Sequence, residues 1–139
     1  MKKVKPQATV YSKRFKMPLT SSWTYCKGGV AVKKRRIILY ATENGRITTQ
    51  QLEALRKVVM RRLQRQGRLR FCVFPHHPVT LKGAGVRMGR GKGKVNHWVV
   101  LVQQGAWLVE LLSDTPLRAQ FALLAGTKKL AIQAGILLL

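Results

Sequence analysis

Glycine alternates with cationic residues in the segment from Val86 to Val95, which reads Val-Arg-Met-Gly-Arg-Gly-Lys-Gly-Lys-Val. Glycine adopts positive φ readily and lets the backbone approach another surface closely. Arginine and lysine supply positive charge for phosphate groups. We therefore predict that the segment lies against a polyanion, with the backbone of Gly89, Gly91 and Gly93 close to it. The cations expected to meet its phosphates are Lys82, Arg87, Arg90, Lys92 and Lys94.

The whole chain is strongly basic. It has 27 Lys and Arg against 4 Asp and Glu, a net charge of +23 in 139 residues. Such a domain repels itself unless an anion neutralises it, and nucleic acid is the usual partner. A surface that is basic only for solubility is a weaker interpretation. A membrane surface is weaker still, because the cations are spread over several segments rather than along one amphipathic helix. We predict an RNA-binding protein.

The glycine-rich segment does not fit the nucleotide-binding loops. A Walker A loop needs Gly, four residues, then Gly-Lys followed by Ser or Thr. Lys92 and Lys94 each follow a glycine, but Val86 and Met88 stand where the first glycine should be. The glycines also miss the Gly-x-Gly-x-x-Gly spacing of dinucleotide-binding folds. We expect neither nucleotide hydrolysis nor a small-molecule substrate.

Two further chemistries were weighed and not favoured. A metal site would have to use Cys72, His76, His77 and His97. These residues include no Cys-x-x-Cys knuckle, and a cysteine in an apolar strand behaves as a small apolar residue. The four acids form no carboxylate pair or triad, and each has a structural explanation in a turn, a helix, a strand or a cap. We expect no metal, no cofactor and no enzymatic activity.

The spacing of apolar residues predicts a basic N-terminal arm over residues 1–36 and one α+β domain over residues 37–139. Four consecutive cations end the arm and are expected to bind RNA: Lys33, Lys34, Arg35 and Arg36. The expected order is a strand at 37–41, a helix, a strand at 69–74, a loop at 75–95, a hairpin of 97–102 with 107–112, a helix, and a strand at 130–139. This order predicts one mostly antiparallel sheet with two helices packed on one face.

The first helix is the clearest element. Thr48 and Gln51 have the spacing of a capping box, and Gly67 is expected at the left-handed C′ position. Its buried face is expected to hold Leu52, Leu55, Val59 and Leu63. Its opposite face is expected to present Lys57, Arg61 and Arg65, without acidic partners, to RNA. Arg46, just before the helix, is expected to bind RNA as well.

The second helix should begin at Thr115 as N-cap, with Pro116 at its first position. We predict that Leu117, Phe121 and Leu124 form its buried stripe and that Gly126 ends it.

No targeting or membrane segment is evident. No apolar run approaches the roughly 18 residues of a membrane span, and the basic start lacks the apolar region of a secretory signal. Cys26 and Cys72 are too few for a disulfide framework, so a reducing compartment is expected. The acid-free first 42 residues fit an organelle transit peptide or an RNA-binding arm, and both alternatives stay open.

Four segments together resemble large-subunit ribosomal protein L-sixteen. The segment 44–54 resembles its Gly-Arg-(Leu/Ile)-(Thr/Ser)-x-x-x-(Ile/Leu)-Glu-Ala, and 74–80 its Phe-Pro-Asp-x-Pro-(Ile/Val)-Thr. The segment 86–93 resembles its Val-Arg-Met-Gly-Lys-Gly-Lys-Gly, with Arg90 in place of lysine. Trp98–Val100 and Gly105–Leu111 match its hairpin. The match covers about residues 37–130 in the family's order and spacing.

The resemblance implies a structural protein of the large ribosomal subunit. Members dock on rRNA near the base of the central protuberance, beside the tRNA-binding cleft, and join late in assembly. Their glycine-rich loop extends toward the tRNA acceptor arms and the peptidyl-transferase region. Carried over, the loop cations would meet rRNA or tRNA, and Arg46 with the helix cations would meet rRNA. Neighbouring ribosomal proteins are expected partners. The alternative function is that of a free RNA- or tRNA-binding accessory protein.

The chain also departs from the family pattern. Lys82-Gly83-Ala84-Gly85 stands where the family has Lys-Pro-x-Glu, and the family's Phe-Gly-x-x-Gly-Leu segment is not recognisable. This divergence favours a mitochondrial member, with a bacterial cytoplasm or a plastid as alternatives.

Overall fold

The computed structural model describes residues 35–89 and 91–139. Most of the predicted N-terminal arm, including Lys33 and Lys34, lies outside the described residues, and so does Arg90. The elements follow in the order β1 (Arg35–Ala41), β2 (Gly45–Thr48), α1 (Thr49–Arg62), β3 (Arg68–Phe71), β4 (His77–Leu81), β5 (Lys94–Val102), β6 (Trp107–Ser113), α2 (Pro116–Thr127) and β7 (Ala134–Leu138).

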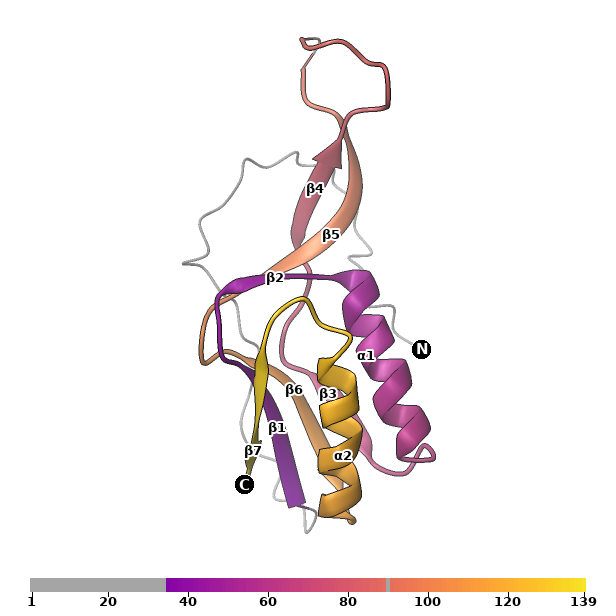
Figure 1. Cartoon of the computed structure of the whole chain (residues 1–139), viewed down its shortest axis with the longest axis vertical. Helices are drawn as coiled ribbons and strands as arrows, with labels where there is room; N and C mark the ends of the chain where they lie inside the picture. The colour runs from indigo at the N-terminus through magenta and orange to yellow at the C-terminus, as the bar shows by residue number, and fades with distance from the viewer. Residues whose placement is uncertain (1–34, 90) are drawn as a thin grey trace.

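The strands form two antiparallel sheets rather than one. A four-stranded sheet has the order β3-β6-β1-β7, and a three-stranded sheet has the order β2-β5-β4. The prediction of an α+β fold with antiparallel pairing is confirmed, whereas the prediction of a single sheet is wrong. Helices α1 and α2 lie side by side over one face of the four-stranded sheet, as predicted (Figure 1).

The predicted hairpin of 97–102 with 107–112 is also wrong, because β5 and β6 belong to different sheets. The turn between them is tied to the end of β1. The N–H of Gly105 donates to the carbonyl of Ala41 at 2.8 Å, and the N–H of Ala41 donates to the carbonyl of Ala106 at 2.9 Å. These bonds hold the crossing point where the chain passes from one sheet to the other.

Helix α1 begins as predicted and ends earlier. The N–H of Gln51 donates to Thr48 Oγ1 at 3.2 Å, and the N–H of Thr48 donates to Gln51 Oε1 at 2.9 Å, which confirms the capping box. The helix ends at Arg62 rather than near Gly67. The N–H of Arg65 donates to the carbonyl of Met60 at 2.9 Å, a Schellman bond in which Gln64 takes the left-handed C′ position at φ +51°. Arg65 therefore lies beyond the helix.

Helix α2 has the predicted N-cap, Thr115, followed by Pro116. Its predicted buried stripe is wrong. Leu117, Phe121 and Leu124 are 70%, 65% and 51% exposed. The buried residues are instead Ala119, Ala122, Leu123 and Gly126.

Small residues explain this orientation of α2, because they let the two helix backbones approach closely. A Cβ on Gly126 would lie only 2.9 Å from Cγ2 of Val59 on α1. Gly126 is thus a packing residue and does not end the helix, which continues to Thr127. The core beneath joins Leu52, Leu55 and Val59 of α1 to the buried side chains of β1 and β6.

Strands β2 and β4 were not predicted from the sequence, and β4 lies inside the predicted 75–95 loop. Pro78 argues against a central strand, but β4 is at the edge of its sheet, where proline is tolerated. The ladder of β4 with β5 runs from His77↔Val99 to Leu81↔Lys94. The loop is consequently shortened to residues 82–93, and it projects from the far end of this ladder (Figure 1).

Candidate RNA interface

The projecting loop, residues 82–93, is the most separate part of the described chain (Figure 1). It contains no acidic residue. Met88 is 94% exposed and Val86 is 56% exposed, so even its apolar side chains are left to solvent. A segment with such exposure gains little stability from packing on its own protein.

Three loop glycines have a backbone reason for being glycine. Gly85, Gly89 and Gly91 have φ of +77°, +100° and +79°, in the left-handed region that L side chains rarely adopt. A Cβ at each of them would meet nothing within 4 Å. Glycine is therefore needed at these positions for the left-handed backbone conformation and not for close packing inside the protein. The space around this backbone is empty in the structure.

Gly93 differs from these three. A Cβ there would collide with the carbonyl of Leu81, where the chain leaving β4 passes the chain entering β5. Gly93 thus has an intramolecular role at the base of the loop, and its approach to RNA stays a prediction.

The cations in and beside the loop differ in exposure. Arg87 and Lys92 of the loop and Lys94 at the start of β5 are exposed. Lys82 is half-buried, and its Nζ donates to the carbonyl of Gly89 at 2.8 Å. Lys82 therefore ties the base of the loop to its far side.

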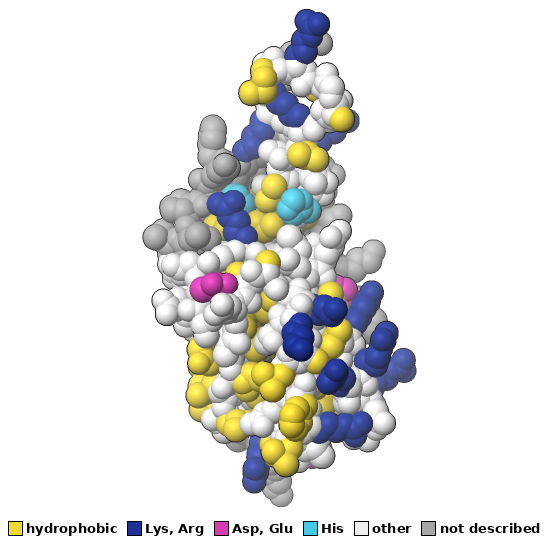
Figure 2. All heavy atoms as spheres, in the orientation of Figure 1, with side chains coloured by type: hydrophobic (Ala, Val, Ile, Leu, Met, Phe, Trp, Pro, Cys, Tyr) yellow, Lys and Arg dark blue, Asp and Glu magenta, His cyan; other side chains and the backbone are white. Residues whose placement is uncertain are grey.

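The predicted cations of the body are mostly exposed. Arg46 lies on β2, Lys57 and Arg61 lie on α1, and Arg65 lies in the turn after it. In the view of Figure 2, Lys and Arg side chains gather over the loop and along the α1 side of the body. The structure does not bring all predicted cations onto one continuous patch in this view.

Glu53 on α1 pairs with Arg56, a cation outside the set that is predicted to face RNA. Glu53 Oε1 and Oε2 accept from Arg56 NH2 at 2.6 Å and Arg56 Nε at 3.0 Å. This hydrogen-bonded pair lowers the pKa of Glu53, with a further Coulombic contribution from Lys57. The same pair raises the pKa of Arg56.

The two described cations of the predicted arm lie in β1, which begins two residues earlier than predicted. Arg35 is exposed. Arg36 Nε lies 3.0 Å from Glu110 Oε1 on β6, and Arg70 NH1 of β3 lies 3.9 Å from Glu110 Oε2. Arg36 is thus part of a cross-strand charge cluster, so any contact with RNA would compete with Glu110.

Other chemistry finds little support in the described part of the chain. No three His, Cys, Asp or Glu side chains there are close enough to hold a metal ion. Cys72 is buried, and His76 Nδ1 lies 3.1 Å from the carbonyl oxygen of Phe74. Glu43 Oε1 accepts from the N–H of Gln133 at 2.7 Å, which closes the turn before β2 against the chain entering β7. Within the same residues, no helix has both the length and the apolar character needed to cross a membrane.

Sequence reasoning missed a basic groove between the two helices. Arg62, Lys128 and Lys129 line it together with Arg61, the only one of the four that was predicted as an RNA contact. Two adjacent pairs of cations were the available signal, but only the packing of α2 against α1 brings them together.

Comparison with known proteins identifies the family of the chain. A model of the family "Ribosomal protein L16p/L10e" matches residues 6–137. The chain is 36% identical to the large ribosomal subunit protein uL16 of Cereibacter sphaeroides over 133 residues, which are 96% of this chain and 95% of that protein. It is 37% identical to the uL16 of Hyphomonas neptunium over 133 residues, covering 96% and 94%. It is 42% identical to the uL16 of Wigglesworthia glossinidia brevipalpis over 94 residues, covering 68% and 69%. The match extends over nearly the whole chain, and the chain belongs to the ribosomal protein L16p/L10e family.

Proposed function

We propose that this chain is a structural, rRNA-binding component of the large ribosomal subunit. Its family is one of ribosomal proteins, and its relatives carry the name "Large ribosomal subunit protein uL16". The net charge of +23 gives the physical basis, because rRNA is the polyanion that can neutralise it inside a subunit.

The projecting loop is the part that we assign to the functional centre of the subunit. The carrying observation is its geometry: an acid-free loop whose left-handed glycines have open space around them and in which Arg87 and Lys92 are exposed. Such a loop can lay its backbone against RNA while Arg87, Lys92 and Lys94 reach phosphates. We assign its contacts to rRNA and tRNA near the peptidyl-transferase region, with the body docked at the base of the central protuberance late in assembly.

We assign no catalytic step to the chain. The three glutamates hold structural positions: Glu43 closes a turn, Glu53 pairs with Arg56, and Glu110 pairs with Arg36. We place the protein in a mitochondrial ribosome. The support is sequence divergence at the loop base, where Gly83-Ala84-Gly85 replaces the expected Pro-x-Glu.

Co-sedimentation tests the ribosomal assignment. The tagged full-length chain should remain with large subunits through a high-salt wash, since an integrated protein is held by many contacts at once. Loss of the chain from washed subunits would instead favour a free RNA- or tRNA-binding accessory protein. Fractionation of the source cells into mitochondria and cytosol tests the location in the same preparation.

A matched pair of cation variants tests the loop. Arg87→Ala removes an exposed loop cation, and Arg68→Ala removes an exposed cation on β3 that we do not place at RNA. We expect Arg87→Ala to lower polysome content and translation rate while Arg68→Ala leaves both near normal. Equal effects of the two changes would show that the loop has no special place in translation.

A further inference from the structure

A stripe of large hydrophobic side chains is left exposed along α2. Leu117, Phe121 and Leu124 follow one another at intervals of four and three residues, so they share one face of the helix. Each is more than half exposed, and Leu138 and Leu139 at the end of the chain are 51% and 62% exposed. Figure 2 shows hydrophobic side chains gathered over this lower part of the molecule. Exposed apolar surface of this kind marks an interaction site.

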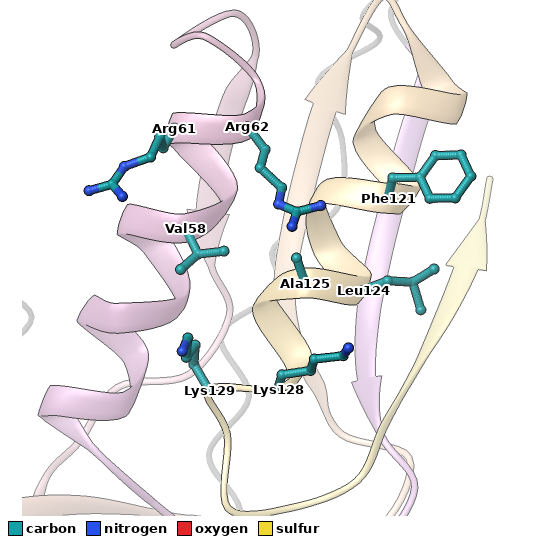
Figure 3. Close-up of a pocket in the computed structure, with 8 residues that line it drawn as sticks. All are labelled: Val58, Arg61, Arg62, Phe121, Leu124, Ala125, Lys128 and Lys129. Carbon is teal, nitrogen blue, oxygen red and sulfur yellow. The ribbon is translucent and has the colours of Figure 1, made fainter.

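A groove of about 580 Å³ lies next to the stripe, between α1 and α2. It is lined by four apolar residues and four cations: Val58, Phe121, Leu124, Ala125, Arg61, Arg62, Lys128 and Lys129. Val58 and Arg62 point toward α2, while Phe121 and Leu124 project from the other flank of α2 (Figure 3). No acidic residue lines the groove. Its occupant must therefore bring both apolar groups and negative charge.

Direct contacts between α1 and α2 fix the shape of the groove. Arg118 Nε of α2 donates to the carbonyl of Arg62 at the end of α1, at 3.2 Å. Gly126 brings the two helices into close contact beneath the groove. The exposed side chains therefore stand on a rigid pair of helices, as a docking surface requires.

The two kinds of group on this surface favour a protein over RNA. An RNA backbone would satisfy the cations, but riboses and phosphates offer little apolar surface to Leu117 and Leu124. Burying these leucines stabilises a complex most when the partner surface is apolar as well. An amphipathic helix supplies apolar side chains at the spacing of the stripe and carboxylates for the flanking cations.

We propose that the α1–α2 groove and the α2 stripe form a docking site for an acidic amphipathic helix of a neighbouring protein. The proposal rests on the proposed function in that the neighbour belongs to the same ribosomal subunit. The site is separate from the loop, which projects at the opposite end of the molecule (Figure 1).

A peptide titration with the full-length chain tests the proposal without ribosomes. The probe is a fluorescent synthetic helix of about five turns with leucines on one face and glutamates elsewhere. Fluorescence anisotropy should show that Phe121→Ser with Leu124→Ser weakens binding roughly tenfold or more. The matched control is Leu81→Ser, which removes a 64% exposed leucine from the end of β4 and should leave binding within about twofold.

Two further probes separate docking from charge attraction. A peptide of the same composition with its leucines spread around the helix should bind at least tenfold more weakly, because only the charge remains. A single-stranded RNA of similar length should bind the wild-type chain and the Phe121→Ser, Leu124→Ser variant equally well. The proposal is overturned if the two peptides bind alike, or if the double change weakens RNA rather than peptide. Absence of the chain from washed subunits would overturn the ribosomal assignment while leaving this titration's result unaffected.

Discussion

The loop end and the helical body use the same residue types in opposite ways. In the body, a Cβ on Gly126 would meet Val59, and the cation Arg36 meets Glu110. In the loop, a Cβ on Gly89 or Gly91 would meet nothing within 4 Å, and no acid is present. At these positions the body pairs its residues internally, whereas the two loop glycines have open space around them.

Salt should affect the two regions very differently, and this is the largest expected effect. RNA affinity of the chain should fall roughly a thousandfold or more between about 50 and 200 mM salt, on the scale known for duplex DNA. The free energy of unfolding should instead rise modestly over the same range, because salt screens the repulsion within a chain of net charge +23. Filter binding and urea titrations measure the two quantities. A flat salt dependence of RNA affinity would mean that the cations serve solubility alone.

Truncating a side chain in the body core should lower the free energy of unfolding far more than truncating one in the loop. Leu55 is fully buried between α1 and the sheets, so Leu55→Ala should lower the free energy of unfolding by about 2–5 kcal/mol. Met88 is 94% exposed at the loop, so Met88→Ala should change it by less than about 0.5 kcal/mol. Urea denaturation followed by tryptophan fluorescence compares them. Similar losses would show that the loop packs on the body.

What could be predicted from the sequence was local. The capping box of Thr48 with Gln51 and the Thr115-Pro116 start of α2 depend on neighbours within three residues. The face of α1 was also predictable, since Leu52, Leu55 and Val59 are its obvious apolar positions. The alternation of glycine with cations predicted the loop, although its contacts with RNA remain a prediction.

What failed depended on distant partners. The strands at 97–102 and 107–112 look like a hairpin, but each finds a better partner elsewhere in the chain. Both faces of α2 are apolar, and we predicted that its larger side chains would be buried. Instead the small residues Ala122 and Gly126 face α1, and Phe121 is exposed. The groove beside Phe121 could not be predicted, because it exists only when Gly126 brings the helices together.

The two classes of glycine should respond differently to valine. Gly126→Val places branched carbons against Val59 and Leu55 and should cost about 1–3 kcal/mol of stability, beyond the small gain in helix propensity. Gly91→Val meets open space and costs only the strain of a left-handed residue, about 1–2 kcal/mol at most. The order should reverse for function, with Gly91→Val impairing subunit maturation. Thermal melts of the free variants and polysome profiles of cells measure the two effects. Normal polysomes with Gly91→Val would make the loop a tolerant linker.

Replacing a strained residue of the body by glycine is expected to increase the stability of the protein. Gln64 occupies the left-handed C′ position after α1 at φ +51°, which glycine adopts without penalty. Gln64→Gly should raise the free energy of unfolding by about 0.5–1 kcal/mol, because relief of the left-handed penalty exceeds the extra backbone entropy that glycine loses on folding. Gln66→Gly, two residues on and outside the positive-φ pair, is the control and should not stabilise. Destabilisation by Gln64→Gly would show that the Schellman geometry is not the one that the free protein adopts.

Acid should produce the smallest effect, and only in the body. The pKa of Glu53 is lowered by its hydrogen bonds from Arg56, so the charged carboxylate is favoured in the folded state. Its stabilisation is present above the unfolded pKa of about 4.5 and is lost as the pH falls through the lower folded value. The pair is only partly buried and still reached by solvent, so the loss should be modest. Stability of the wild-type chain should therefore decline slightly more below this pH than that of Glu53→Gln, as followed by urea denaturation. The loop contains no carboxylate that could titrate there. A matching decline in Glu53→Gln would show that the acid sensitivity does not arise from the pair of Glu53 with Arg56.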